Sequence, residues 1–279
     1  MNLASAISPL KLYNNASEVP AIMGFDFSSD LAEVCGIHAG DGYLRNDGKR
    51  RELDISGGID EKEYYDSHVV PLFERVFGIN ITPKFFPKRH TYGFVIRDRN
   101  IVEFMHSLGF PYGAKTFTVS VPEFVSNSKN LDILYSFIRG AFDTDGCLAF
   151  QKKVGSGYKS EVKRKHSFPV VQISICSKPF CDGLCSLFRK TGFNCKVVMQ
   201  KPTYDYQHVK YALYLRGYSN LKSWMRNIGF KNTSKLSRYE VWEKFGFCPT
   251  NISFEQRKQI LNNELDPNSF YKHGLVANG

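Results

Sequence analysis

The chain has 279 residues, aromatic side chains make up 14% of them, and the formal net charge is +10. This length allows one large domain or two small ones with a sizeable core, and the aromatic content excludes a disordered basic tail. The charge favours a polyanionic partner. No apolar run is long enough to cross a membrane. The seven cysteines include no Cys-x-x-Cys pair, which predicts an intracellular, reducing compartment such as cytoplasm, nucleoid or an organelle.

The order of predicted elements repeats along the chain. After a leader at 1–27, a first half spans 28–125, a second half spans 126–248, and a C-terminal extension covers 249–279. Hydrophobic periodicity predicts the following elements in the first half: a helix ending at Asp41, strands at 43–45 and 51–56, a helix at 61–77 kinked at Pro71, strands at 79–86 and 92–97, and a helix at 101–108.

The second half repeats this order after a linker at 111–129. Its predicted elements are a helix ending near Asp145, strands at 147–152 and 170–177, a helix at 180–191, strands at 194–200 and 209–216, and a helix at 219–228. We therefore predict an α+β fold of two α-β-β-α-β-β-α halves with four-stranded antiparallel sheets, plus a terminal helix around 255–263. Ser29 or Asp30 is expected to cap the first motif helix, and Ser128 or Asn130 the second.

A short motif opens each half. Val34–Gly42 reads VCGIHAGDG and Ile138–Gly146 reads IRGAFDTDG, and each is an apolar helical run that ends in Asp-Gly before a strand. Gly36 and Gly40 share one helix face, as do Ser136, Gly140 and Thr144. Small residues at this spacing let helix backbones approach closely, so the two motif helices are expected to pack on each other.

Each motif helix ends in an aspartate, Asp41 or Asp145. A negative charge at a helix C-terminus opposes the macrodipole, and two such charges side by side repel each other. A bound cation removes both problems, and carboxylate oxygens suit Mg²⁺ or a similar hard ion.

The paired motifs resemble the signature of the single-chain, two-motif LAGLIDADG homing endonucleases, from about Ser28 to Phe247. This resemblance implies two pseudo-symmetric halves with the motif helices at their interface and the two sheets forming a DNA-binding saddle. It also implies an enzyme, a metal-dependent DNA endonuclease (phosphodiester hydrolase) that makes double-strand breaks at a long recognition site, as in intron homing. The partner is then double-stranded DNA, and the protein acts as a monomer because both halves lie in one chain.

The resemblance assigns the metal site to Asp41 and Asp145, with the adjoining Gly40 and Thr144. The expected ion is Mg²⁺, although Mn²⁺ or Ca²⁺ is also expected to fit. His38 and Ala39 depart from the family pattern, whereas Asp143 keeps the earlier acid of the motif. We interpret His38 as an interface or core residue.

A basic side chain near each aspartate would stabilise charge on the phosphate. The sequence offers three candidates: Lys178, Arg97 and Arg216. The two arginines can act only electrostatically, because a guanidinium does not release its proton.

Two further features predict DNA contacts. Polar residues alternate with apolar ones along the strands, which exposes polar groups suited to reading bases: Asp54, Ser56, Gln172, Ser174, Lys196, Gln200 and Tyr214. Two equivalent hairpin loops carry basic residues suited to phosphates: Arg45, Lys49, Arg50, Arg51, and Lys152, Lys153, Lys159, Lys163, Arg164, Lys165. The plainer interpretations are a hydrated sheet face and solvated loops.

A second repeat closes each half. Leu108-Gly109-Phe110 followed by Lys115 matches Ile228-Gly229-Phe230 followed by Lys235. This repeat supports duplication of the whole unit.

One alternative function keeps the fold but loses cleavage, giving an RNA splicing maturase or a DNA-binding regulator. Another is an enzyme acting on a small acidic metabolite. That reading explains the charge but leaves the repeated motif unexplained, and the sequence contains neither G-x-G-x-x-G nor G-x-x-x-x-G-K-[ST].

Overall fold

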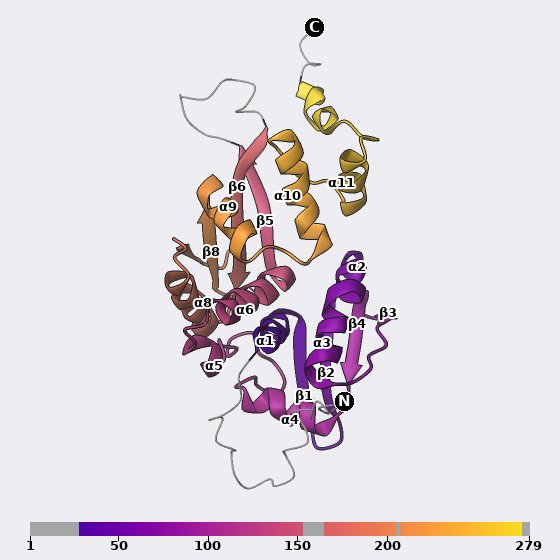
Figure 1. The fold of residues 1–279 in the computed structure, drawn as a ribbon, viewed down its shortest axis with the longest axis vertical. Helices are drawn as coiled ribbons and strands as arrows, with labels where there is room; N and C mark the ends of the chain where they lie inside the picture. Colours follow the sequence, from indigo (N-terminus) through magenta and orange to yellow (C-terminus); the bar gives the residue numbers. More distant parts are fainter. Residues whose placement is uncertain (1–27, 153–164, 205–206, 275–279) are drawn as a thin grey trace, which may run out of the picture.

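The computed structural model describes residues 28–152, 165–204 and 207–274 (Figure 1). The predicted leader at 1–27 and four of the basic loop positions, Lys153, Lys159, Lys163 and Arg164, lie outside these residues.

The first half contains the predicted elements in the predicted order. They are α1 (Ser29–Asp41), β1 (Gly42–Asn46), β2 (Arg51–Gly58), η2 (Ile59–Glu61), α2 (Lys62–Tyr64), η3 (Tyr65–Val69), α3 (Val70–Phe77), β3 (Lys84–Phe86), β4 (Thr91–Ile96) and α4 (Arg99–Ser107). The interruption expected at Pro71 is a π-helical turn, η3, which immediately precedes the helix that carries Pro71. Proline lacks the amide hydrogen that a continuous α-helix would require there.

The second half follows a short helix in the linker. Its elements are α5 (Glu123–Ser126), α6 (Leu131–Thr144), β5 (Gly146–Lys152), β6 (His166–Ile175), α8 (Lys178–Lys190), β7 (Lys196–Gln200), β8 (Lys210–Arg216), α9 (Tyr218–Asn227), α10 (Thr233–Phe245), α11 (Phe254–Leu261) and η4 (Pro267–Gly274). The sequence pattern did not predict α10. Only Ser237 and Val241 of this helix are buried, so it lacks the apolar stripe that marks most surface helices.

The helix caps differ in part from the prediction. Asn130 caps α6 as expected, because its side chain accepts a hydrogen bond from the Asp132 amide at 2.9 Å. The cap of α1 is Ser28 rather than Ser29 or Asp30, because Ser28 has the extended backbone of a cap residue and accepts from the Leu31 amide.

The two sheets have the same topology. Their strand orders are β1-β2-β4-β3 and β5-β6-β8-β7, and all neighbours are antiparallel. Gly42, which follows Asp41, pairs with Ile55, and Gly146, which follows Asp145, pairs with Ile173. The predicted α+β fold of two like halves is confirmed, and each motif aspartate occupies the same point of its half.

Helices α1 and α6 pack directly on each other between the two sheets (Figure 1). A Cβ atom added to Gly36 would lie 2.2 Å from the Phe137 carbonyl oxygen, and one added to Gly140 would lie 2.4 Å from the Glu33 carbonyl oxygen. Backbone therefore touches backbone, which only glycine permits at these positions. The small-residue packing predicted from the sequence is confirmed.

A buried ion group strengthens the same interface. Glu33 on α1 is 1% exposed, contacts Nε2 of His68 at 2.6 Å, and accepts from Nε of Arg139 on α6 at 3.0 Å. Burial alone would raise the pKa of Glu33, but the hydrogen bonds from His68 and Arg139 and the charge of Arg139 lower it below its ordinary value. Arg139 also donates to the Ile228 carbonyl at 3.2 Å, which joins the interface to the end of α9.

The C-terminal extension packs against α10. Arg257 of α11 is buried and donates to the Ser237 hydroxyl and the Ile252 carbonyl, each at 2.8 Å. Lys258 reaches Glu63 of the first half at 3.0 Å, so the extension also connects the two halves. None of the helices in the described part of the chain is long and apolar enough to cross a membrane.

The contact at Gly36 gives a stability prediction. Gly36→Ala should lower the free energy of unfolding by about 1–3 kcal/mol, because a methyl group against fixed backbone costs more than the gain in helix propensity. Gly183→Ala is the comparison and should lower stability less, since its added Cβ would meet Cγ2 of the Val121 side chain at 2.5 Å, with the Val121 amide nitrogen at 3.7 Å. Urea unfolding of both variants tests this. A Gly36→Ala protein as stable as wild type would contradict the packing described.

Candidate active site between the motif helices

The structure brings Asp41 and Asp145 together at the ends of the two crossing helices. Asp41 is the last residue of α1 and Asp145 is the C-cap of α6. A Cβ atom added to Gly40 would lie 3.3 Å from Cγ of Asp145, and each aspartate follows a helix C-terminus that already carries partial negative charge. Two carboxylates thus lie close together at two helix C-termini, where the helix dipoles disfavour negative charge.

Asp41 sits in a closed, acidic corner. Its Oδ2 accepts a hydrogen bond from the Tyr65 hydroxyl at 2.7 Å. Glu61 lies alongside, because a Cβ atom added to Gly57 would be 2.7 Å from Oε2 of Glu61 and 2.8 Å from Oδ2 of Asp41. Burial, with the charges of Glu61 and Asp145, raises the pKa of Asp41 to about 7, although Tyr65 and Lys235 oppose the rise.

Asp145 is more open to solvent. It lines a cavity of about 210 Å³ together with Gly40, Lys115, Ser174 and Cys176. The protein surrounding it raises the pKa of Asp145, and the charges of Lys115 and Lys235 act in the opposite direction. Because the side chain is exposed, solvent moderates this rise more than at Asp41.

Two half-buried lysines that were not predicted as site residues lie beside the aspartates. Nζ of Lys115 donates to the Gly40 carbonyl at 2.6 Å, and Nζ of Lys235 donates to the Thr144 carbonyl at 2.6 Å. Each ammonium therefore neutralises the C-terminus of one motif helix. Burial lowers the pKa of Lys115 to about 8, even though Asp145 and Asp41 favour its charged form. Burial likewise lowers the pKa of Lys235.

The signal for these lysines was present in the sequence. Lys115 follows Gly109 by the same number of residues as Lys235 follows Gly229, in the phrase that closes each half. By itself, the repeat indicates only duplication. Nothing in its local pattern shows that the chain returns from α4 or α9 to the motif helix, so the role of the lysines depends on tertiary structure.

Asn232 links the site across the two halves. Its side chain is fully buried, donates to Oε1 of Glu61 at 2.6 Å and to the Asp143 carbonyl at 2.8 Å, and accepts from the Ser234 amide at 3.1 Å. It therefore caps α10, which carries Lys235, while holding Glu61 next to Asp41.

Two of the other proposed catalytic residues, Arg97 and Arg216, lie apart from the aspartates. Asp41 comes immediately before Gly42 of β1, and Gly42 pairs with Ile55 of β2. Ser56, the residue after Ile55, pairs with Gly93 of β4, so Gly93 marks the level of Asp41 along the sheet. Arg97 is four residues beyond Gly93, about 13 Å along the strand, and its Nε bonds Oε1 of Glu52 at 2.9 Å.

Arg216 lies equally far along β8, four residues beyond Ala212, and its Nη1 bonds Oε1 of Gln151 at 3.0 Å. Lys178, on the first turn of α8, bonds Oδ1 of Asp182 at 2.7 Å.

His38 is a core histidine, as interpreted from the sequence. Its ring is fully buried and packs edge-on against Phe110 at 4.4 Å, and neither ring nitrogen has a hydrogen-bond partner. Burial and the nearby Lys115 lower its pKa well below the ordinary value, so the ring is neutral. Asp143 is also buried, accepts from the Lys231 amide at 2.8 Å, and has a pKa raised by burial to about 7.

The outer face of the second sheet carries the predicted polar row. Gln172 pairs with Tyr214, which pairs with Lys196, so these three side chains share a face. Nε2 of Gln200 donates to the Tyr214 hydroxyl at 3.3 Å. On the opposite face of β7, Val197 and Met199 are 41% and 55% exposed.

In the first sheet, Asp54 and Ser56 face outward and are half-buried, while Leu53 and Ile55 are buried beneath them. Of the basic residues predicted for the first hairpin loop, Lys49 and Arg50 lie in the loop, whereas Arg45 lies in β1 and Arg51 begins β2 because the two strands pair up to Asn46 and Arg51. Lys152 is exposed at the end of β5. Lys165 instead bonds Asn268 at 2.8 Å in the C-terminal extension.

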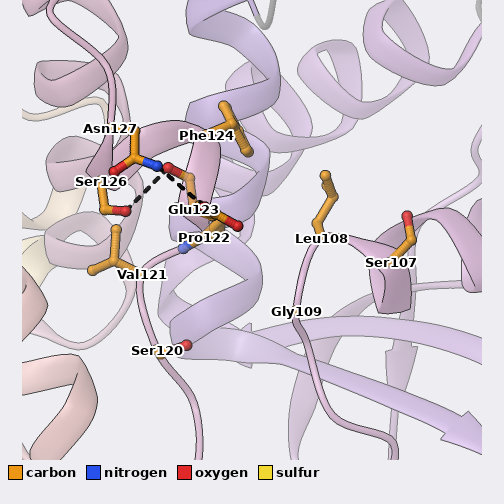
Figure 2. A pocket seen from close by; sticks show the side chains of 10 residues that line it. All are labelled: Ser107, Leu108, Gly109, Ser120, Val121, Pro122, Glu123, Phe124, Ser126 and Asn127. Atoms are coloured by element: carbon orange, nitrogen blue, oxygen red, sulfur yellow. Dashed lines mark hydrogen bonds between the residues drawn. The ribbon is translucent and has the colours of Figure 1, made fainter. Parts of the chain in front are cut away.

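A second hollow of about 600 Å³ lies between the end of α4 and α5 (Figure 2). Figure 2 shows Asn127 and Ser126 bonded to Glu123, at 3.3 and 3.0 Å. The residues that line this hollow include none of those predicted to be functional.

Comparisons with known proteins give weak likenesses. No protein-family model matches the chain. The replication factor C small subunit of Methanocaldococcus jannaschii is 27% identical over 213 residues, which cover 76% of this chain and 10% of that protein. The chain thus spans about a tenth of the length of the curated relative it matches.

Solved structures are similar to this chain at low identity and at TM-scores below 0.5. Mesophilic variants of the homing endonuclease I-DmoI give a TM-score of 0.49 at 13% identity, covering 73% of this chain and 91% of theirs. A mutant of I-SmaMI gives 0.48 at 13% identity over 88% of this chain and 98% of its own. Full-length DUF199/WhiA from Thermatoga maritima gives 0.45 at 12% identity over 88% and 84%. Because these scores lie below 0.5, fold and function are inferred from the chain itself.

The raised pKa of Asp41 predicts a stability change. Between its ordinary value of 3.8 and about 7 the folded state binds the extra proton. The free energy of unfolding therefore falls as pH rises through this window. Asp41→Asn removes this cost and should raise the free energy of unfolding by about 1–3 kcal/mol at about pH 8 in EDTA, and by less below about pH 4.

Asp132→Asn is the matched control, because this exposed aspartate lies in the first turn of α6, where its charge is favourable. Urea unfolding across pH measures both. If Asp41→Asn is less stable than wild type at about pH 8, the carboxylate is not electrostatically strained.

Proposed function

We propose that this protein is a site-specific DNA endonuclease of the LAGLIDADG type that requires a divalent metal ion and cuts both strands. The observation that carries this proposal is the pair Asp41 and Asp145, held at the ends of two crossing helices between two like sheets, with a half-buried lysine beside each.

The donor set fits a hard divalent ion. Among the residues that the structure describes, no three His, Cys, Asp or Glu side chains are grouped to hold a metal. The two carboxylates at Asp41 and Asp145 supply oxygen ligands, and water and a phosphate oxygen would complete the shell of Mg²⁺, which usually retains several waters. Mn²⁺ or Ca²⁺ would take the same oxygens. The carbonyls of Gly40 and Thr144 remain candidate ligands beside them, although each already accepts from a lysine.

The electrostatics support this assignment. Burial and mutual repulsion raise the pKa of Asp41, so the neighbouring lysines do not fully compensate its charge. When bound, the ion would activate water for attack and stabilise the negative charge of the departing oxygen. The chain's own contribution is to hold the two carboxylates in place through Tyr65 and the packed helices.

Lys115 and Lys235 are proposed to stabilise charge on the phosphate. They lie beside Asp145 and Asp41. Partial removal from water strengthens the attraction between each ammonium and a negative charge that develops on the phosphate. With its pKa lowered to about 8, Lys115 can also release or accept a proton near neutral pH. Arg97 and Arg216 are reassigned from catalysis to DNA contact, because both lie far along the outer sheet face. Lys178 stays a candidate for phosphate contact.

The substrate follows from charge and shape. A net charge of +10 favours a polyanion, and the outer faces of two antiparallel sheets carry amide, hydroxyl and guanidinium groups that hydrogen-bond to base edges. The basic residues of the hairpin loops are proposed to contact phosphates on either side of the read bases.

Cleavage can be tested without knowing the target. A plasmid library with randomised inserts is incubated with the protein and Mg²⁺, and linear molecules are captured and sequenced. Wild type should yield one family of cut sequences, and EDTA should prevent cutting. On that site, Asp41→Asn and Asp145→Asn should each abolish double-strand cleavage while DNA affinity stays within a few-fold.

Asp132→Asn serves as an exposed carboxylate control that should cut normally. Selective binding without cutting would favour the maturase or regulator alternative. A double mutant of Asp41 and Asp145 that still linearises the plasmid would exclude both residues from the mechanism.

The internal duplication predicts one chain for each DNA site, since both halves already lie in a single polypeptide. Sedimentation of the complex with the selected duplex should give the mass of one 31.9 kDa chain plus DNA. A complex that forms only with two chains would contradict the monomeric arrangement.

A further inference from the structure

The two outer sheet faces differ in a way that the duplicated topology does not require. Among the strands in the described residues, acidic side chains occur only at Glu52 and Asp54, both on β2 of the first sheet. Both face outward, opposite to the buried Leu53 and Ile55. No strand of the second sheet, within the residues described, carries a carboxylate.

The carboxylates of the first sheet hold arginines. Nε of Arg97 bonds Glu52 at 2.9 Å, and Nη1 of Arg89 bonds Asp54 at 2.8 Å. Arg45 lies opposite Glu52 in the strand register at 4.0 Å, but its hydrogen-bond partner is Asp47 of the hairpin loop, at 2.8 Å. The arginine side chains are 37–67% exposed, whereas Glu52 and Asp54 are each 17% exposed. The carboxylates therefore lie beneath, and the guanidinium groups above them are exposed and fixed in orientation.

The second sheet offers amides in place of carboxylates. Gln172 and Gln200 flank Tyr214, and the hydroxyl of Ser174 is 3.5 Å from Oε1 of Gln200. The register places Val198 opposite Ala212, and Ala212 opposite Ser174. A valine that is 37% exposed thus lies in the middle of the polar face.

We propose that the two sheets read half-sites of unlike composition: the first sheet favours guanine·cytosine pairs, and the second favours adenine·thymine pairs. This inference rests on the proposed DNA-binding function.

The chemistry of base edges supports each assignment. A guanidinium held by one donor edge keeps its remaining N–H groups for O6 and N7 of guanine, and a carboxylate accepts from the amino group of cytosine. The same carboxylates repel phosphate, so Glu52 and Asp54 favour base contacts over backbone contacts on this sheet.

The second sheet matches the other pair. A glutamine can bond N6 and N7 of adenine together, and an exposed valine methyl suits the C5 methyl of thymine. Lys196 and Lys210 on the same face are compact, mobile charges better suited to phosphates. Arg216 is the one arginine on these strands, and its guanidinium stacks over Tyr214 at 4.7 Å while bonding Gln151.

The test is binding-site selection with the full chain in EDTA, using duplexes with a randomised central segment. The expected result is one half-site rich in G·C pairs and the other rich in A·T pairs. Arg97→Lys keeps the charge but removes the planar guanidinium, whose paired N–H groups can bond O6 and N7 of guanine together. It should therefore reduce preference for guanine at a position in the G·C-rich half by about five- to 150-fold. Val198→Ser should reduce preference for thymine at a position in the other half.

Each variant has a matched control. Arg99→Lys changes an exposed arginine on α4 that pairs with Glu103 away from the sheet, and Val197→Ser changes the neighbouring valine, whose register partner is the buried Leu213. Neither control should alter base preference. Exposed positions were chosen so that the variants fold, which circular dichroism verifies.

The outcomes separate the two proposals. Selected sites with equal composition in both halves would overturn the half-site inference and leave DNA recognition intact. The half-site inference would also be overturned if Arg97→Lys or Val198→Ser weakened binding to all DNA sequences by the same factor. If no sequence is enriched at all, DNA recognition itself fails, and the half-site inference fails with it.

Discussion

The contact between α1 and α6 at Gly36 and Gly140 is the constraint on which the rest of the structure depends. Because no side chain separates the two backbones there, the helices cross at a fixed depth and their last residues are brought together. Each helix leads directly into the first strand of its sheet, so the crossing also fixes where the sheets lie. Glu33 and Arg139 add a buried charge pair to the same interface and limit sliding of one helix on the other.

This geometry concentrates negative charge. Two helix C-termini and two aspartates meet, and burial makes the charge at Asp41 more costly still. The protein offsets part of this cost with Lys115 and Lys235, each placed on the carbonyls of one helix end. Structure alone would be better served by neutral residues, since replacing a buried charge group with apolar packing is often stabilising. The proposed catalytic role gives a reason for four charges in one small volume that stability does not supply.

The halves share topology but differ in their surroundings. Asp41 is bonded by Tyr65 and crowded by Glu61, which Asn232 ties to the second half, whereas Asp145 opens onto a cavity. The sheets differ as well, with carboxylate-held arginines on one outer face and amides with an apolar centre on the other. A fold made of two equal units can thus recognise an asymmetric partner, because strand register is set by buried residues and the outward positions are free to vary.

The sequence alone determined the duplicated topology, most strand and helix positions, the packed motif helices and the Asp41–Asp145 pair, because hydrophobic period, small-residue spacing and Asp-Gly junctions are local signals. Helix α10 was missed since it lacks an apolar stripe, and Arg97 and Arg216 were placed near the aspartates because periodicity gives a face but no position along the strand. Lys115 and Lys235 were visible as a repeat. Only tertiary structure decided that these lysines bind the motif helices, because their carbonyl partners are distant in sequence and no local pattern encodes such a contact.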